Sequence, residues 1–152
     1  METNYSFSKM MDEMGYIVYT TRGFSMRPLI RQGKDIVTIQ RYTKPPQKYD
    51  VVLFQRKNGQ YVLHRILKVY EGRYWIIGDN CITGEMVNRD QIIGKMTSLK
   101  RNKRMIKETD RMYRLFSRVW YWIFPLRYCV WRVKMFVYRC SSFVKRRLLK
   151  IK

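Results

Sequence analysis

Apolar and polar residues alternate along the first hundred positions in the manner of short β-strands. Strand-like runs of this kind cover residues 16–21, 36–40, 51–54, 61–70, 74–77 and 91–96. Turn residues separate several of these runs, as at Lys57-Asn58-Gly59. About six short strands at this spacing predict a mainly β domain with an antiparallel sheet. A short helix is expected before them, because apolar residues recur at helical spacing within residues 4–14 and Gly15 supplies an end signal.

The pattern changes near residue 100. Residues 100–104 (Lys-Arg-Asn-Lys-Arg) are interpreted as a basic linker, and helical periodicity then runs from Glu108 to Phe124. Pro125 is expected to kink or stop that helix, because proline lacks the N–H that a helix interior needs. Residues 126–144 predict a second helix that is less cleanly amphipathic.

Charge divides the chain at the same place. Residues 1–99 hold 15 Lys/Arg and 9 Asp/Glu, a net +6, whereas residues 100–152 hold 17 Lys/Arg and 2 Asp/Glu, a net +15. Such different charge densities indicate different tasks. We therefore expect a β domain over residues 1–99 and a basic, aromatic-rich helical tail over residues 100–152.

Cysteine and histidine usage argues against a bound metal. The three cysteines have no C-x-x-C spacing and the chain holds one histidine, so neither a zinc site nor a cofactor is expected. The thiols are expected to be reduced. The amino-terminus lacks the basic start and apolar core of a signal peptide. No run reaches the roughly 18 consecutive apolar residues of a membrane-spanning helix.

A serine stands in a predicted loop that could carry chemistry. Ser25 is followed by Met26, Arg27 and Pro28, and the proline prevents regular structure from continuing through the loop. A serine hydroxyl becomes a good nucleophile only when a nearby base takes its proton. The single histidine, His64, lies in a strand-like run, and imidazole is a competent general base near neutral pH. Ser25 and His64 are therefore candidates for a catalytic pair.

Several short motifs surround these two residues. In chain order they are Ser25-Met26-Arg27-Pro28, Gly33-Lys34-Asp35, Tyr49-Asp50-Val51-Val52-Leu53-Phe54, Leu63-His64-Arg65-Ile66, Gly78-Asp79-Asn80 and Ile93-Gly94-Lys95. Over residues 16–99 this series resembles the signal peptidase superfamily of serine proteases, which also contains self-cleaving repressors. The His-Arg motif is similar to that of the Ser-His type, in which histidine replaces the lysine base of bacterial enzymes. The resemblance implies a signal-peptidase-like antiparallel β domain.

The resemblance also implies roles for individual residues. Ser25 would be the nucleophile and His64 the general base. In the Ser-His type an acid shortly after the Gly-Asp-Asn motif orients the histidine, and Glu85 stands near that position here. Asp79 is an alternative orienting acid, and a Ser-His dyad that uses neither carboxylate is a third arrangement.

Three residues near the motifs bear on this interpretation. Gly23 stands where bacterial family members often have a hydroxyl side chain for the oxyanion hole, and Phe24 replaces a usual glycine. The hole would then depend on the backbone N–H of Ser25. Cys81 lies beside the Gly-Asp-Asn motif and would suit a Cys-His protease, but none of the motifs supports that alternative.

The tail has three interpretations. It could be a helix that packs on the β domain with its charged side in solvent. Alternatively, residues 111–140 could bind an anionic membrane surface, with aromatic side chains at the headgroup level and Arg and Lys on the lipid phosphates. The same residues could bind nucleic acid through phosphate contacts and base stacking. The density of aromatic residues and the uncharged run Val119–Leu126 favour the membrane.

Two functions follow as expectations. The first is a membrane-associated serine endopeptidase that cleaves a peptide or precursor protein by a Ser-His mechanism. The second is a peptidase-fold scaffold that has lost turnover and works through its cationic tail. The sequence leaves the substrate, the membrane topology, a partner subunit and the oligomeric state open.

Overall fold

The structure, a computed structural model, describes residues 6–149, with side chains placed for residues 6–138. It divides into two compact units between Arg118 and Val119. The first unit holds the sheet and the beginning of the helical tail. The division thus lies further along the chain than the expected boundary after residue 99.

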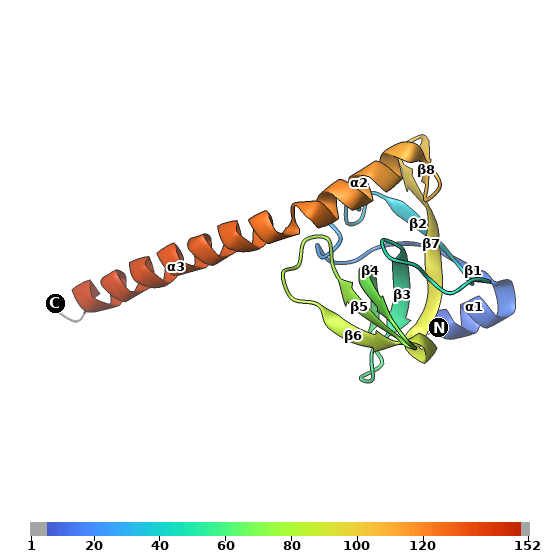
Figure 1. Cartoon of the computed structure of the whole chain (residues 1–152), viewed down its shortest axis with the longest axis horizontal. Helices are drawn as coiled ribbons and strands as arrows, with labels where there is room; N and C mark the ends of the chain where they lie inside the picture. Colours follow the sequence, from blue (N-terminus) through green and yellow to red (C-terminus); the bar gives the residue numbers. More distant parts are fainter. Residues whose placement is uncertain (1–5, 150–152) are drawn as a thin grey trace, which may run out of the picture. The chain divides into compact units, whose positions relative to one another are not determined.

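Eight strands form one antiparallel sheet, which confirms the expected mainly β fold (Figure 1). The strands are β1 (Tyr16–Thr20), β2 (Ile36–Gln40), β3 (Val51–Gln55), β4 (Tyr61–Tyr70), β5 (Arg73–Ile77), β6 (Glu85–Asn88), β7 (Ile92–Arg101) and β8 (Arg104–Lys107). Their order is β1-β2-β7-β3-β4-β5-β6, and β8 pairs with β7. The sheet curls strongly (Figure 1). Its buried apolar side chains form two separate clusters.

The core lies on both faces of β3. Val51 and Leu53 belong to one buried cluster, and Val52 and Phe54 belong to another. Successive strand residues point to opposite faces, so a strand buried on both sides appears as a continuous apolar run. This arrangement places β3 and its neighbour β4 in the middle of the unit, where side chains are held firmly.

The helix α1 (Phe7–Met14) precedes the sheet, as expected. Gly15 ends it in the left-handed conformation (φ 73°), and its N–H donates to the Met11 carbonyl. A glycine adopts this conformation without the strain of a Cβ atom. The expected start of the helix at residue 4 lies outside the described residues.

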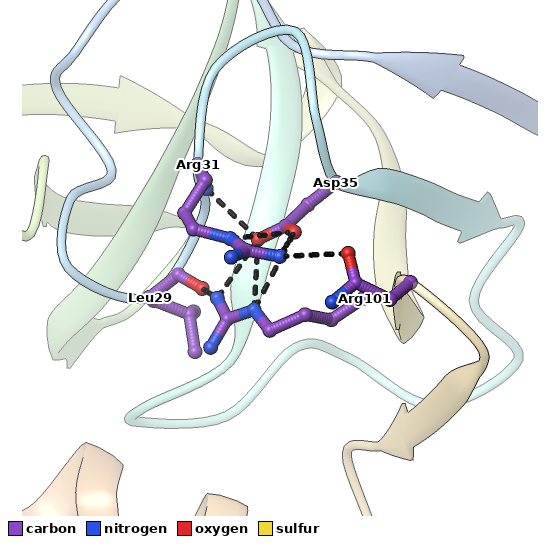
Figure 2. A network of polar contacts seen from close by, with 5 residues as sticks. Leu29, Arg31, Asp35 and Arg101 are labelled. Atoms are coloured by element: carbon purple, nitrogen blue, oxygen red, sulfur yellow. Dashed lines mark hydrogen bonds and ion pairs between the residues drawn. The ribbon is translucent and has the colours of Figure 1, made fainter.

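The basic segment at residues 100–104 is not a linker, contrary to expectation. It closes the hairpin between β7 and β8, with Arg101 and Arg104 paired across the turn. Figure 2 shows the reason: Arg101 and Arg31 both donate to the fully buried carboxylate of Asp35. The prediction was wrong because an arginine that pairs with a distant buried acid has the same local pattern as an exposed one.

Two helices follow the sheet, in agreement with the expected helical tail: α2 (Arg111–Trp122) and α3 (Phe124–Leu149). A 3₁₀ turn, η1 (Arg89–Gln91), precedes β7. The break expected at Pro125 occurs at Ile123, and Pro125 lies in the first turn of α3, where the missing N–H has no helical partner in any case. No helix within residues 6–149 is both long and apolar enough to cross a membrane.

Candidate active site

Ser25 lies in the loop between β1 and β2. The neighbouring Met26 is 4% exposed and belongs to the core cluster beneath the loop. The Ile30 N–H donates to the Met26 carbonyl at 2.9 Å, and the Asn80 N–H donates to the Ser25 carbonyl at 2.7 Å. The loop is therefore fixed from below by packing and from the side by the turn after β5.

His64 lies in β4, opposite Val52 of β3. Only 7% of the residue is exposed, and its ring lies 6.2 Å from that of Phe54. The buried Nδ1 atom has no hydrogen-bond partner among the described residues. The other ring nitrogen, Nε2, faces the turn that contains Gly78.

Gly78 brings Ser25 and His64 together. A Cβ atom at this position would lie 2.7 Å from the Ser25 carbonyl oxygen, 2.9 Å from His64 Nε2 and 2.8 Å from Cys81 Sγ. Distances this short are steric clashes, so only glycine fits between these three residues. The close approach of the Ser25 loop to His64 thus requires the glycine of the Gly-Asp-Asn motif.

Ser25 and His64 line one cleft of about 880 Å³. No hydrogen bond joins Ser25 Oγ to His64 Nε2 in the part of the chain that the structure describes. Catalytic hydrogen bonds are often long in an unliganded site and tighten when substrate binds. The structure thus places both residues in one cleft, and their catalytic roles stay a prediction.

Glu85, the first residue of β6, lies at the far side of the imidazole. Its Oε1 atom is 3.8 Å from His64 Nδ1, a distance too long for a hydrogen bond. Both carboxylate oxygens instead accept hydrogen bonds from Arg56, from Nε at 2.8 Å and from Nη2 at 2.5 Å. Glu85 is thus placed to act on His64 through its charge, while Arg56 fixes its orientation.

Asp79 has a different partner. Its two oxygens accept hydrogen bonds from Arg65 Nε and Nη2 at 2.7 and 2.8 Å, and both side chains are almost fully buried. Arg65 Nη1 also donates to the Tyr49 carbonyl and to Ser117 Oγ, each at 2.8 Å. Of the two acids, Glu85 lies at the free nitrogen of His64, whereas Asp79 holds the turn that positions Gly78.

Burial lowers the pKa of His64 from 6.5 to about 4. The negative charges of Glu85 and Asp79 act in the opposite direction, and the positive charge of Arg56 adds to the lowering. Burial has this effect because it penalises the charged imidazolium. The ring is therefore neutral at pH 7 and able to accept a proton.

The edge of the sheet forms one wall of the cleft. Residues 19–22, at the end of β1, line it together with residues 60–64 of β4 and its preceding turn. β1 is the last strand in the sheet order, and no other strand in the described part of the chain pairs with its outer edge. An unpaired edge offers backbone N–H and C=O groups to an extended peptide.

Two arginines of this site were not predicted from the sequence. Arg56 stands just before the turn Lys57-Asn58-Gly59, and Arg65 belongs to the His-Arg motif. Strand alternation does not reveal which acid an arginine meets. The one available signal was the position of Arg65 inside an apolar strand, since an arginine is rarely buried there without a partner. Among residues 6–149, no group of three or more potential metal ligands comes together.

A scan against protein-family models and a search of curated proteins find no match to this chain.

Proposed function

We propose that the chain is a serine endopeptidase of the Ser-His type, resembling the signal peptidase superfamily, that cleaves an extended peptide at a membrane surface. The proposal is carried by one observation: Ser25 and His64 line a single cleft and both approach Gly78 closely. A serine and a neutral imidazole in a shared cleft are the minimum that acyl transfer requires.

In the proposed reaction, Ser25 Oγ attacks the scissile carbonyl while His64 Nε2 accepts its proton. The same proton then passes to the leaving amine as the C–N bond breaks, which leaves an acyl-enzyme. Water then attacks this ester with His64 as the base. As the acyl–Oγ bond breaks, His64 returns the proton to Ser25 Oγ and the second product is released. The attacks by Ser25 and by water each need a neutral imidazole at their start, in agreement with the lowered pKa of His64.

The negative charge on the tetrahedral oxygen needs donors. The backbone N–H of Ser25 makes no hydrogen bond to any other described residue, so it is available for this oxygen. The Asn80 N–H already fixes the Ser25 carbonyl and thereby the orientation of this peptide unit. With Gly23 in place of a hydroxyl residue, the oxyanion hole has no side-chain donor at that position.

Glu85 is proposed to assist His64 through its charge. When the imidazole takes up a proton, a carboxylate 3.8 Å from Nδ1 stabilises the imidazolium. A small rotation toward the ring would give a direct hydrogen bond, at the cost of one bond to Arg56. Asp79 is assigned the separate task of holding the Gly78 turn through Arg65.

Membrane association is proposed from the second unit. The exposed side chains of α3 include Leu126, Val130, Val133, Phe136 and Val137, each at least 59% exposed, and cations are interspersed among them. An interfacial helix inserts apolar side chains below the headgroups and leaves its cations at the lipid phosphates. Nucleic acid is not favoured, because that many exposed aliphatic side chains have no role in phosphate or base contacts.

The test uses purified protein and a diverse peptide library, with and without anionic vesicles, read by mass spectrometry. Ser25→Ala and His64→Ala should each abolish cleavage, because each removes a group that takes part in bond breaking. Cys81→Ala is the matched control, since it alters the same wall of the cleft without removing either group, and it should retain cleavage. Full activity in Ser25→Ala would refute the peptidase proposal.

A scaffold without turnover is the second candidate. It is favoured by the missing Ser25–His64 hydrogen bond and by the bidentate engagement of Glu85 with Arg56. In this case wild-type protein yields no products from any peptide, and Ser25→Ala behaves like wild type in vesicle binding. Products that appear only with wild type and Cys81→Ala would exclude it.

A further inference from the structure

A second, smaller cleft lies in the first unit, away from Ser25. It measures about 250 Å³ and is lined by residues from the loop before β3, from β7 and from α2. The lining residues are Lys48, Tyr49, Asp50, Lys95, Glu108, Thr109, Tyr113, Arg114, Ser117 and Arg118. This volume is below the roughly 300–1,000 Å³ of drug-sized ligand sites, so the cleft suits one small polar group.

The cleft carries an excess of positive charge. Four of its lining residues are cationic and two are anionic. Both acids are engaged by one of the cations: Lys95 Nζ lies 2.7 Å from Glu108 and 3.6 Å from Asp50. Hydrogen bonds and charges from these acids raise the pKa of Lys95 against the lowering effect of burial, so that it stays protonated. Neither Arg114 nor Arg118 forms an ion pair with these acids.

Arg114 and Arg118 are the two arginines that line this cleft. They are four residues apart on α2, so their side chains lie on the same side of the helix. Both are exposed, and neither makes a salt bridge or a side-chain hydrogen bond to any residue that the structure describes. Elsewhere in the unit, Arg31, Arg56, Arg65 and Arg101 all bind carboxylates. Two neighbouring guanidinium groups without an acid can together donate to the oxygens of one anion.

The floor of the cleft is rigid. Arg65, which is 1% exposed, donates from Nη1 to both the Tyr49 carbonyl and Ser117 Oγ, and Ser117 Oγ in turn donates to the Tyr113 carbonyl at 2.9 Å. These bonds fix α2 to the loop before β3. The positions of Arg114 and Arg118 on α2 are thereby set in advance, which lowers the entropic cost of binding.

We propose that this cleft binds a phosphate group, with Arg114 and Arg118 as its ligands. A guanidinium group presents paired N–H donors that match two oxygens of a phosphate. The phosphate could belong to a lipid headgroup or to a soluble compound, and both sources present the same chemistry. The proposal is independent of peptidase activity, since it uses no residue of the Ser25 cleft.

The experiment compares two pairs of substitutions in the full-length protein. Arg114→Gln with Arg118→Gln removes the proposed ligands. Arg104→Gln with Arg111→Gln is the matched control, because it removes the same charge from exposed positions of β8 and α2 that do not line the cleft. Glutamine is a good helix former, so α2 should stay folded, as circular dichroism would verify.

Two ligands are tested. Phosphatidylcholine vesicles that contain phosphatidic acid present the phosphate at a surface, and binding is followed by co-sedimentation. Glycerol phosphate presents it in solution, and binding is followed by calorimetry. Loss of any two basic residues weakens attraction to an anionic surface by about 25-fold. Loss of the hydrogen bonds in the cleft should weaken vesicle binding by a further factor of at least about ten in the Arg114/Arg118 variant alone.

The outcomes separate the sources. Binding of glycerol phosphate that the Arg114/Arg118 variant loses and the control retains shows that the phosphate alone suffices. A difference between the two variants on vesicles only assigns the cleft to a lipid headgroup. Equal losses in both variants on vesicles, with no variant-dependent binding of glycerol phosphate, would overturn the proposal. Peptide cleavage by Ser25 is measured without vesicles, so failure of either proposal leaves the other intact.

Discussion

Apolar side chains are buried in the first unit, which ends at Arg118 and is called the β unit below, and exposed on the helix α3. In the β unit, Leu53 and Ile39 are at most 1% exposed, whereas Leu126 and Val133 of α3 are 66% and 63% exposed. Burial of such side chains is the main favourable contribution to folding, so the β unit holds its own source of stability. The apolar side chains of α3 contribute little of this kind until something covers them, and a lipid surface would do so.

Charged residues show the same contrast. The β unit neutralises its buried charges within itself, as in the Arg65–Asp79 pair and in the cluster of Asp35 with Arg31 and Arg101 (Figure 2). The sequence of α3 contains no aspartate or glutamate at all. Its cations have no acid on their own helix, so their counter-charges must come from elsewhere. Matched substitutions in the two regions therefore test whether stability and surface binding are divided between them.

The largest difference in stability is expected when arginine is replaced by methionine at one buried and one exposed position. Arg65→Met removes the arginine that binds both oxygens of the buried Asp79 carboxylate, which should lower the free energy of unfolding by about 3–5 kcal/mol. Arg132→Met changes an exposed residue of α3 and should alter it by less than about 0.5 kcal/mol. Urea unfolding followed by circular dichroism measures both. Similar effects of the two substitutions would contradict the division.

Two leucines extend the test to apolar residues. Leu53→Ala opens a cavity between β4 and β7 and should cost about 2–5 kcal/mol. Leu126→Ala removes the same atoms from an exposed site and should cost less than about 0.5 kcal/mol. In vesicle co-sedimentation the ranking should reverse, with weaker binding for Leu126→Ala only. Unchanged vesicle binding in Leu126→Ala would argue that this residue does not insert.

The main architecture of the β unit could be predicted because its local signals agree with its final structure. Runs such as 36–40 and 51–54 alternate or are continuously apolar, and each became the expected strand. The strand β8 was missed because two of its four residues are basic and three are exposed, so it lacks a buried apolar pattern. Its stability comes from pairing with β7 and from the Arg101–Asp35 contact, which join residues far apart in the sequence.

The candidate site could be predicted to a similar extent. Ser25, His64 and Gly78 were recognisable because their motifs stand in order along the chain. The partners of Glu85 and Asp79 were not, because an acid near a histidine in a motif can equally bind an arginine on another strand. Arg56 engages Glu85 and Arg65 engages Asp79, and neither contact follows from residue spacing.

The stability of the β unit should depend on pH through His64. The helix α3 should add nothing to this dependence between pH 7 and about pH 4, since it holds no histidine, aspartate or glutamate. The pKa of His64 is lowered to about 4 in the folded chain, whereas the unfolded chain has the usual 6.5. Between these values the unfolded state binds the additional proton, so stability is full above pH 6.5 and falls by about 3 kcal/mol toward pH 4.

His64→Gln cannot take up this proton, so its stability should change much less between pH 6.5 and about pH 5, above the range where most carboxylates titrate. His64 is the only histidine of the chain, which makes the assignment direct. The same pKa predicts that peptide cleavage rises with pH through about 4 and is level near neutrality. A rate that rises only through pH 6–7 would show that the imidazole is less buried in solution than in this structure.

The smallest effect is expected at Asp35, in a lower pH window. Burial alone would raise its pKa, but hydrogen bonds from Arg101 and Arg31 lower it from 3.8 to about 2. The stabilisation by the charged form is complete above pH 3.8 and is lost as pH falls toward 2, by about 2 kcal/mol. Asp35→Asn should remove this acid-dependent part and weaken the protein already at pH 7, whereas the exposed Asp90→Asn should do neither. Because Asp35 joins the loop after Ser25 to the β7–β8 hairpin, an Asp35→Asn protein as stable as wild type would show that neither depends on this contact.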